Sequence, residues 1–173
     1  MHISFCEILY AVTIDGMKIL TSTILFMLFS SQAPAIENSL HPFETDGCTM
    51  FVDGPIKRPG LWRHCCEEHD MRYWFGGNSA DLDKTDLRLK ECVNEVAGPR
   101  WAQLIYKGVR AGHSAPVKNK MKWSWGWIKE RPLVKLNADE EFYVISELRR
   151  LPYDTAVIEK FIARNFNHEH EAF

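Results

Sequence analysis

The chain has 173 residues, of which 21 are lysine or arginine and 23 are aspartate or glutamate, so its formal net charge is −2 at pH 7. This length allows one domain with a substantial core and is short for two. The basic residues form no run longer than a pair such as Arg149 and Arg150. A nearly balanced charge without a basic run argues against a nucleic-acid-binding protein.

The first 35 residues have the pattern of a secretory signal. Met17 is followed by Lys18, an apolar run covers 19–29, and Ala-Pro-Ala occupies 33–35. This order is typical of a signal peptide cleaved after residue 35, with Met17 as an alternative start. The apolar run has about half of the roughly 20 residues that a membrane-spanning helix needs. We expect export to the periplasm or the outside of the cell, or membrane anchoring if the signal is not cleaved.

Four cysteines remain once such a signal, which contains Cys6, is removed: Cys48, Cys65, Cys66 and Cys92. In an exported chain this number indicates two disulfides. Neighbouring side chains on a helix point about 100° apart, which disfavours a bridge between Cys65 and Cys66. Cys48 therefore pairs with one of them and Cys92 with the other, and both arrangements remain open at this point.

The middle of the chain predicts a loop followed by two short-linked helices. Residues 48–60 are rich in glycine and proline without an apolar period, which is typical of a loop. A helix is predicted over 61–75 and ends at the glycine pair 76–77. Asn78 or Ser79 can cap a second helix that ends at Gly98. The connection between the two helices is so short that we expect them to be antiparallel neighbours.

Three further helices complete the prediction. One covers 100–109 and is broken by the sequence AGHSAP. Asn137 and Glu140 have the spacing of a capping box that opens a helix to about residue 150, and another helix is predicted over 155–165. Because no stretch alternates with a period of two, the predicted fold class is all-α. We expect a helical core over 36–112 and a tryptophan-rich, helical extension over 113–173.

Alternating tryptophans and lysines mark the start of this extension. They are Trp123, Trp125, Trp127, Lys120, Lys122 and Lys129. This composition suits a lipid interface. It equally suits a loop whose aromatic side chains cover the core, and the sequence alone does not decide between the two.

The two linked helices each place polar residues where a core should lie. On the second helix, Asp86 shares an apolar stripe with Leu89 and Val93. A buried carboxylate needs a partner, since leaving it unpaired costs several kcal/mol. On the first helix, His69 and Tyr73 share a face because they are four residues apart. That face is the expected partner of Asp86.

The helix register brings the histidine and the carboxylate level if Cys65 pairs with Cys92. His69 lies about 6 Å past Cys65 along its axis, and Asp86 lies about 9 Å before Cys92 along the other. Antiparallel helices make these displacements point the same way, so His69 and Asp86 come within about 3 Å axially. A histidine oriented by a carboxylate can act as a general base, here on water because no thiol or serine nucleophile is evident beside it.

Asp70 points away from His69, toward the loop that precedes the first helix. Loop carbonyls and carboxylates are hard oxygen donors, which calcium prefers. A calcium ion there could bind a phosphate and polarise an ester carbonyl.

Two motifs, CCxxHDxxY and DxxLxxC, occur at Cys65, Cys66, His69, Asp70 and Tyr73 and at Asp86, Leu89 and Cys92. Together they resemble the secreted phospholipase A2 superfamily. The Asp-Gly-Cys sequence at 46–48 is similar to the bacterial and fungal branch of that family. The resemblance covers about a quarter of the chain and implies two antiparallel, disulfide-linked helices with a calcium loop.

The resemblance also implies a function and roles for individual residues. The implied activity is calcium-dependent hydrolysis of phospholipid acyl esters at a membrane surface. His69 would activate water, Asp86 would orient His69, and Tyr73 would hydrogen-bond to Asp86. The implied calcium ligands are Asp70, Asp46 and Gly47. The bridges expected with this site are Cys48 to Cys66 and Cys65 to Cys92.

The chain departs from the animal enzymes of this family at three places. Thr49–Phe51 follow Cys48 in place of a glycine-rich calcium loop. Arg72 and Thr85 replace two cysteines that pair in those enzymes. Both positions lie about 10.5 Å from the Cys65–Cys92 link, so we expect Arg72 and Thr85 to be level on the two helices.

Two other interpretations compete with hydrolysis. A zinc site could use His64, Cys65, Cys66 and His69, but adjacent cysteines do not easily share one tetrahedral ion. A phospholipase A2-like scaffold can also serve as a non-catalytic, lipid-binding or regulatory module. Nothing in the sequence points to a protein partner.

Overall fold

The computed structural model describes residues 13–14, 17–18, 38–114 and 122–166. The chain divides into two units, Met1–Ala33 and Pro34–Phe173. In the first unit, β1 (Thr13–Ile14) and β2 (Met17–Lys18) pair antiparallel. Apart from these four residues, the predicted signal peptide lies outside the described residues. Among the helices of the described ranges, none is long and apolar enough to cross a membrane.

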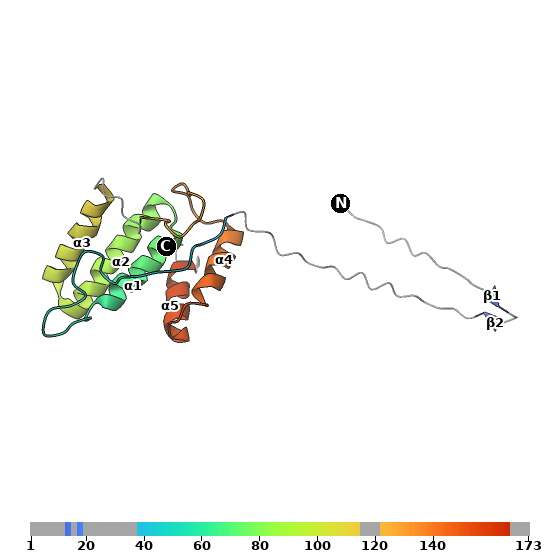
Figure 1. The fold of residues 1–173 in the computed structure, drawn as a ribbon, viewed down its shortest axis with the longest axis horizontal. Helices are drawn as coiled ribbons and strands as arrows, with labels where there is room; N and C mark the ends of the chain where they lie inside the picture. The colour runs from blue at the N-terminus through green and yellow to red at the C-terminus, as the bar shows by residue number, and fades with distance from the viewer. Residues whose placement is uncertain (1–12, 15–16, 19–37, 115–121, 167–173) are drawn as a thin grey trace, which may run out of the picture. The chain divides into compact units, whose positions relative to one another are not determined.

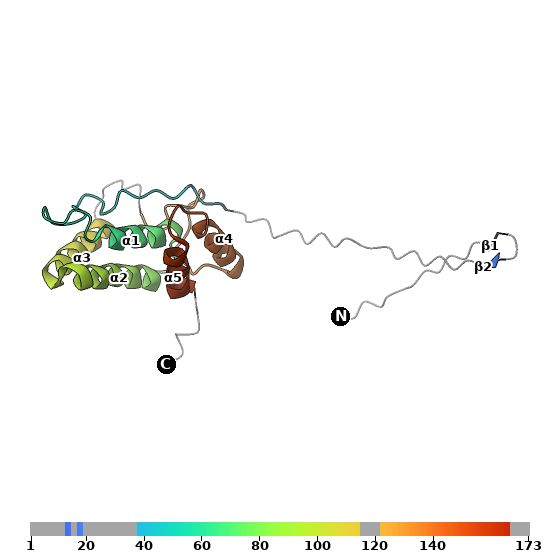
Figure 2. The ribbon, with the colours of Figure 1, turned by 90° about the horizontal axis from the view of Figure 1, so that it is seen from below.

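The described residues of the second unit form five helices, as Figure 1 shows, and the all-α prediction is confirmed for them. The helices are α1 (Arg63–Phe75), α2 (Ser79–Ala97), α3 (Pro99–Ser114), α4 (Ala138–Leu148) and α5 (Thr155–Phe166). In both ribbon views, α1 and α2 lie side by side between α3 on one flank and α4 with α5 on the other (Figures 1 and 2).

The turn between α1 and α2 requires glycine. Gly76 ends α1 with φ +69°, and its backbone N–H donates to the carbonyl of Arg72. A Cβ at Gly76 would lie 1.8 Å from Oγ of Ser124, so a side chain does not fit there. Asn78 then caps α2 in a capping box with Asp81, as one of the two predicted caps. The short turn sends α2 back along α1.

Paired residues show that α1 and α2 are antiparallel. The Cys65–Cys92 disulfide, the His69–Asp86 contact and the ion pair of Arg72 with Asp81 advance along α1 while they retreat along α2. The second disulfide joins Cys48 to Cys66. Both expected bridges are present, which decides between the two pairings that the cysteine count left open.

The predicted end of the third helix was wrong. The sequence AGHSAP was expected to break it after residue 109, but α3 continues to Ser114. Glycine disfavours a helix by only about 1 kcal/mol. Side chains in this last turn bond to α1 and α2, since Arg110 contacts Asp86 and His113 contacts Tyr73. These tertiary contacts compensate for a weak local preference.

Two apolar clusters fill the unit. The first joins the disulfides to α2 and α3 through Cys48, Trp62, Cys65, Cys66, Leu89, Val93, Ala102 and Ile105. The second joins the end of α1 to α4 and α5 through Met71, Trp74, Phe75, Trp127, Val144, Leu148, Ile158, Phe161 and Ile162. Each cluster packs against one part of the α1–α2 pair. The polar residues of α1 and α2 therefore lie on helices that are held by apolar packing from both clusters.

Of the three alternating tryptophans, Trp127 belongs to the second cluster and Trp125 packs against it. Trp127 is buried and donates its indole N–H to the carbonyl of Phe75. Trp123 donates to the carbonyl of Gly77, and Trp125 packs against the cluster. Of the two interpretations of this segment, the structure favours the covering of the core.

Candidate active site

Asp86 is the centre of the candidate site and is fully buried. Its Oδ1 lies 3.0 Å from Nε2 of His69 and accepts a 2.7 Å hydrogen bond from the hydroxyl of Tyr73. An ionised carboxylate only accepts hydrogen bonds, so Nε2 of His69 carries the proton. The second ring nitrogen, Nδ1, is free of hydrogen in the neutral imidazole and lies on the side of Asp70, 3.9 Å from its Oδ1. The structure thus brings His69, Tyr73 and Asp86 together.

Helix α3 contributes two residues that the sequence did not assign to a site. Nη1 of Arg110 lies 3.1 Å from Oδ2 of Asp86 and also bonds to Asp83. Nε2 of His113 lies 3.5 Å from the same Oδ2 and contacts the hydroxyl of Tyr73. Arg110 and His113 are three residues apart, so they share a helix face. That spacing was visible in the sequence, but only the packing of α3 on α2 shows what the face meets.

The charges of these groups depend on one another. Burial alone would raise the pKa of Asp86, but hydrogen bonds from His69 and Tyr73 hold it below its ordinary value. Burial alone would lower the pKa of His69, but its attraction to Asp70 and Asp86 raises it. Burial, with the charge of Asp86, raises the pKa of Tyr73. At neutral pH, Asp86 is therefore ionised and Tyr73 remains a hydrogen-bond donor.

The segment 45–53 contacts Asp70 of α1 and contains the other two predicted calcium ligands, Asp46 and Gly47. Oδ2 of Asp70 accepts a 2.7 Å hydrogen bond from Thr45, and the same hydroxyl accepts a 3.1 Å bond from the backbone N–H of Gly47. Asp46 is exposed and accepts a hydrogen bond from Thr49. Asp46 and Gly47 therefore lie in the same short segment that contacts the carboxylate of Asp70.

This segment has a backbone shape that only glycine permits at residue 47. Gly47 has φ +81°, and a Cβ there would lie 2.4 Å from Oδ1 of Asp53. Asp53 itself accepts from the backbone N–H of Cys48 and pairs with Arg63 at 2.6 Å. The carboxylate of Asp53 therefore braces the segment.

The donor set fits a hard divalent cation. Asp70 is buried, and burial, with the nearby charge of Asp46, raises its pKa above the ordinary value. Its carboxylate accepts a hydrogen bond from Thr45 and lies 3.9 Å from Nδ1 of His69. A buried carboxylate without a cation is costly. Carboxylates and backbone carbonyls are ligands that calcium accepts.

The zinc alternative does not fit. Nε2 of His64 lies 3.4 Å from the sulfur of Cys65 and 3.6 Å from that of Cys92. These two sulfurs are bonded to each other, as are those of Cys48 and Cys66. Zinc binds cysteine as the thiolate, so intact disulfides leave no sulfur ligand there.

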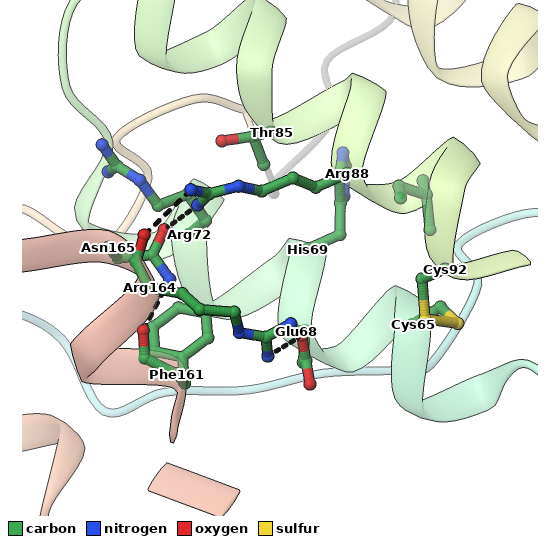
Figure 3. Close-up of a pocket in the computed structure, with 11 residues that line it drawn as sticks. Cys65, Glu68, His69, Arg72, Thr85, Arg88, Cys92, Phe161, Arg164 and Asn165 are labelled. Carbon is green, nitrogen blue, oxygen red and sulfur yellow. Dashed lines mark hydrogen bonds and ion pairs between the residues drawn. A yellow bond between two sulfur atoms is a disulfide. The ribbon is translucent and has the colours of Figure 1, made fainter. Parts of the chain in front are cut away.

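A small pocket of about 50 Å³ lies between α1, α2 and α5 (Figure 3). His69 lines it, together with Arg72 and Thr85, which are both buried and face the same pocket, in keeping with their expected level positions. Arg88 of α2 donates to Oδ1 of Asn165 and to the carbonyl of Arg164 at the end of α5. These hydrogen bonds attach the end of α5 to α2 beside the pocket that His69 lines.

Comparison with models of known protein families, with curated proteins and with solved structures finds no match.

Proposed function

We propose that this chain is a calcium-dependent hydrolase of phospholipid acyl esters, of the phospholipase A2 type. The observation that carries the proposal is the orientation of His69. Its Nε2 is engaged by the buried carboxylate of Asp86, and its Nδ1 lies on the side of Asp70. The base and a candidate metal ligand thus approach each other, with Nδ1 of His69 3.9 Å from Oδ1 of Asp70, although Asp70 was expected to point away from His69.

In this mechanism the protein groups have separate tasks. Nδ1 of His69 takes the proton of the attacking water, as a general base does. Asp86 holds the imidazole in the correct tautomer and stabilises its charged form, and Tyr73 fixes Asp86. Calcium, when bound, supplies an electrophile that binds phosphate and polarises the ester carbonyl. The residues that would hold it are Asp70, Asp46 and Gly47.

An exposed apolar loop supports a membrane surface as the place of reaction. Met50, Phe51, Val52 and Ile56 are exposed, and Ile56 is followed by the exposed Lys57 and Arg58. The loop is fixed by the Cys48–Cys66 disulfide and by the 2.7 Å hydrogen bond from the indole of Trp62 to the carbonyl of Val52. Apolar side chains held in water beside basic ones suit the surface of a bilayer.

The two disulfides support an oxidising compartment. Export to the periplasm or outside the cell is the proposed location, and it agrees with the signal pattern of the first 35 residues.

A specific observation favours the second candidate, a non-catalytic lipid-binding or regulatory module. The side chain of His69 exposes 8% of its surface, and that of Asp86 exposes none. An ester must reach Nδ1 for hydrolysis, whereas a binding module requires no such access. Both candidates use the same scaffold, but only the hydrolase would turn over an ester.

Release of fatty acid from phospholipid vesicles, with and without calcium, tests the proposal. We expect calcium-dependent release by the unmodified chain, and a loss of about 10²- to 10⁴-fold in His69→Gln. The matched control is His64→Gln, an exposed histidine of the same helix, which should keep full activity. Vesicle binding without release by the unmodified chain would favour the second candidate. Full activity in His69→Gln would end the hydrolase proposal.

A calcium titration tests the metal site separately. Asp70→Asn removes an anionic oxygen donor and should weaken calcium binding, which calorimetry measures without reference to turnover. Glu95→Gln removes an exposed carboxylate of α2 and serves as the control. An unchanged titration in Asp70→Asn would place any calcium site elsewhere.

A further inference from the structure

The two oxygens of Asp86 are divided between two helices. Oδ1 faces α1, where it contacts His69 at 3.0 Å and Tyr73 at 2.7 Å. Oδ2 faces α3, where it contacts Arg110 at 3.1 Å and His113 at 3.5 Å. One carboxylate is therefore held from opposite sides, and neither sequence motif includes the α3 side.

The α3 side of Asp86 provides a permanent positive charge, which the α1 side lacks. A tyrosine hydroxyl and a neutral imidazole donate hydrogen bonds to Asp86, but they carry no charge. A buried carboxylate without a counter-charge is costly, and Arg110 supplies a permanent positive charge that also reaches Asp83 one turn earlier on α2. With Arg110 in place, the charge of Asp86 is balanced even in the neutral form of His69 that a general base requires.

His113 contacts Tyr73 as well as Asp86. A phenol has one proton, and the proton of Tyr73 goes to Oδ1 of Asp86. Nε2 of His113, which contacts the phenol oxygen, is then the donor in that pair. The ring of Trp123 meets the ring of Tyr73 edge-on at a centroid distance of 5.0 Å and limits its movement. Tyr73 is thus fixed by groups from outside α1.

We infer that Arg110 and His113 are positioning residues that hold the carboxylate of Asp86 so that Oδ1 faces His69, and that α3 is therefore part of the site. In this role they act on Asp86 and, through it, on His69, and not on substrate. Their role in turnover rests on the proposed function, but their effect on the ring of His69 does not.

The first readout is kinetic. Arg110→Gln and His113→Phe should each lower kcat about ten- to a hundredfold, because a displacement of about 1 Å at a catalytic group can cost a hundredfold. KM should stay within about twofold, since neither side chain contacts substrate. Arg110→Lys keeps the charge and should recover part of the loss. Arg100→Gln, an exposed arginine of the same helix, should leave both constants unchanged.

The second readout requires no activity. Nitrogen-15 NMR of the histidine rings should show a protonated Nε2 in His69 of the unmodified chain, with a slowly exchanging proton bound to Asp86. That proton signal should be lost or exchange rapidly in Arg110→Gln and His113→Phe but not in Arg100→Gln. If the unmodified chain hydrolyses no ester, this result still tests the inference by itself.

An unchanged His69 ring spectrum in both variants would overturn the inference, whatever the kinetics. A parallel loss of kcat in Arg100→Gln would also overturn it, because the effect would then be general to α3. If Arg110→Gln does not fold, Arg110→Lys and His113→Phe are compared instead, and an unchanged His69 signal in that folded pair would again contradict it.

Discussion

The α1–α2 pair and the α4–α5 pair bury different groups. The buried residues of α1 and α2 include His69, Asp70, Arg72, Thr85 and Asp86, and disulfides attach both helices. The buried residues of α4 and α5 are apolar: Val144, Leu148, Ile158, Phe161 and Ile162. An ion pair between Arg149 and Glu159 links their exposed sides.

This difference reflects how strictly each kind of contact depends on position. A hydrogen bond weakens steeply once its length or angle departs from a narrow range. Apolar packing loses little when a helix shifts slightly, provided that the total volume is conserved. A buried polar network therefore benefits from covalent links, whereas the apolar pair does not require them.

The largest effect is expected from removing both disulfides. Replacing Cys48, Cys65, Cys66 and Cys92 by alanine should lower the free energy of unfolding by about 4–8 kcal/mol, at about 2–4 for each bridge. The total stability of a small domain is about 5–15 kcal/mol, so this variant should be largely unfolded or close to it. Urea unfolding followed by circular dichroism measures the loss. A loss below about 1 kcal/mol would show that packing alone holds α1 and α2 in register.

The second-largest effect on stability is expected from a cavity in the apolar α4–α5 pair. Leu148 of α4 is fully buried, and Leu148→Ala should lower the free energy of unfolding by about 2–5 kcal/mol. Phe142→Ala is the control, because Phe142 is 76% exposed and its removal should cost less than about 0.5 kcal/mol. The ring spectrum of His69 should be unchanged in both. A change at His69 in Leu148→Ala would mean that the two pairs are not independent.

Helix caps test both pairs with the same local chemistry. Asn78 caps α2 and Asn137 caps α4, each in a capping box. Replacing either asparagine by alanine should cost about 1 kcal/mol in urea unfolding. A clearly larger loss for Asn78→Ala would show that the start of α2 also supports the polar network. Equal losses would show that the two pairs differ only in the groups that they bury. No loss of stability in either variant would contradict the capping role.

The smallest effect is expected at the surface of the apolar pair. Arg149→Gln removes the exposed ion pair with Glu159, and the urea midpoint should not change measurably at physiological salt. Arg131→Gln is the contrast, because the side chain of Arg131 is 6% exposed and pairs with Glu140 at 2.6 Å. That variant should shift the midpoint to lower urea. A larger shift in Arg149→Gln than in Arg131→Gln would contradict this ranking by burial.

Local patterns in the sequence determined the helices, apart from the end of α3, and the part of the site that lies on α1 and α2. Glycines 76 and 77 marked the turn, and the spacing of His69 and Asp86 from Cys65 and Cys92 predicted their contact. These predictions succeeded because helix geometry converts residue number into distance along an axis. The bounds of α1, α2, α4 and α5 agree with their patterns within about two residues for the same reason.

Only the tertiary structure decided the rest. The cysteine count left two pairings open, and the alternating tryptophans suited either lipid or core, because both choices depend on what lies across from a side chain. The extension of α3 and the contacts of Arg110 and His113 with Asp86 and Tyr73 have the same origin. A local pattern states which face of a helix a residue occupies, but the partner of that face is set by packing between segments far apart in the chain.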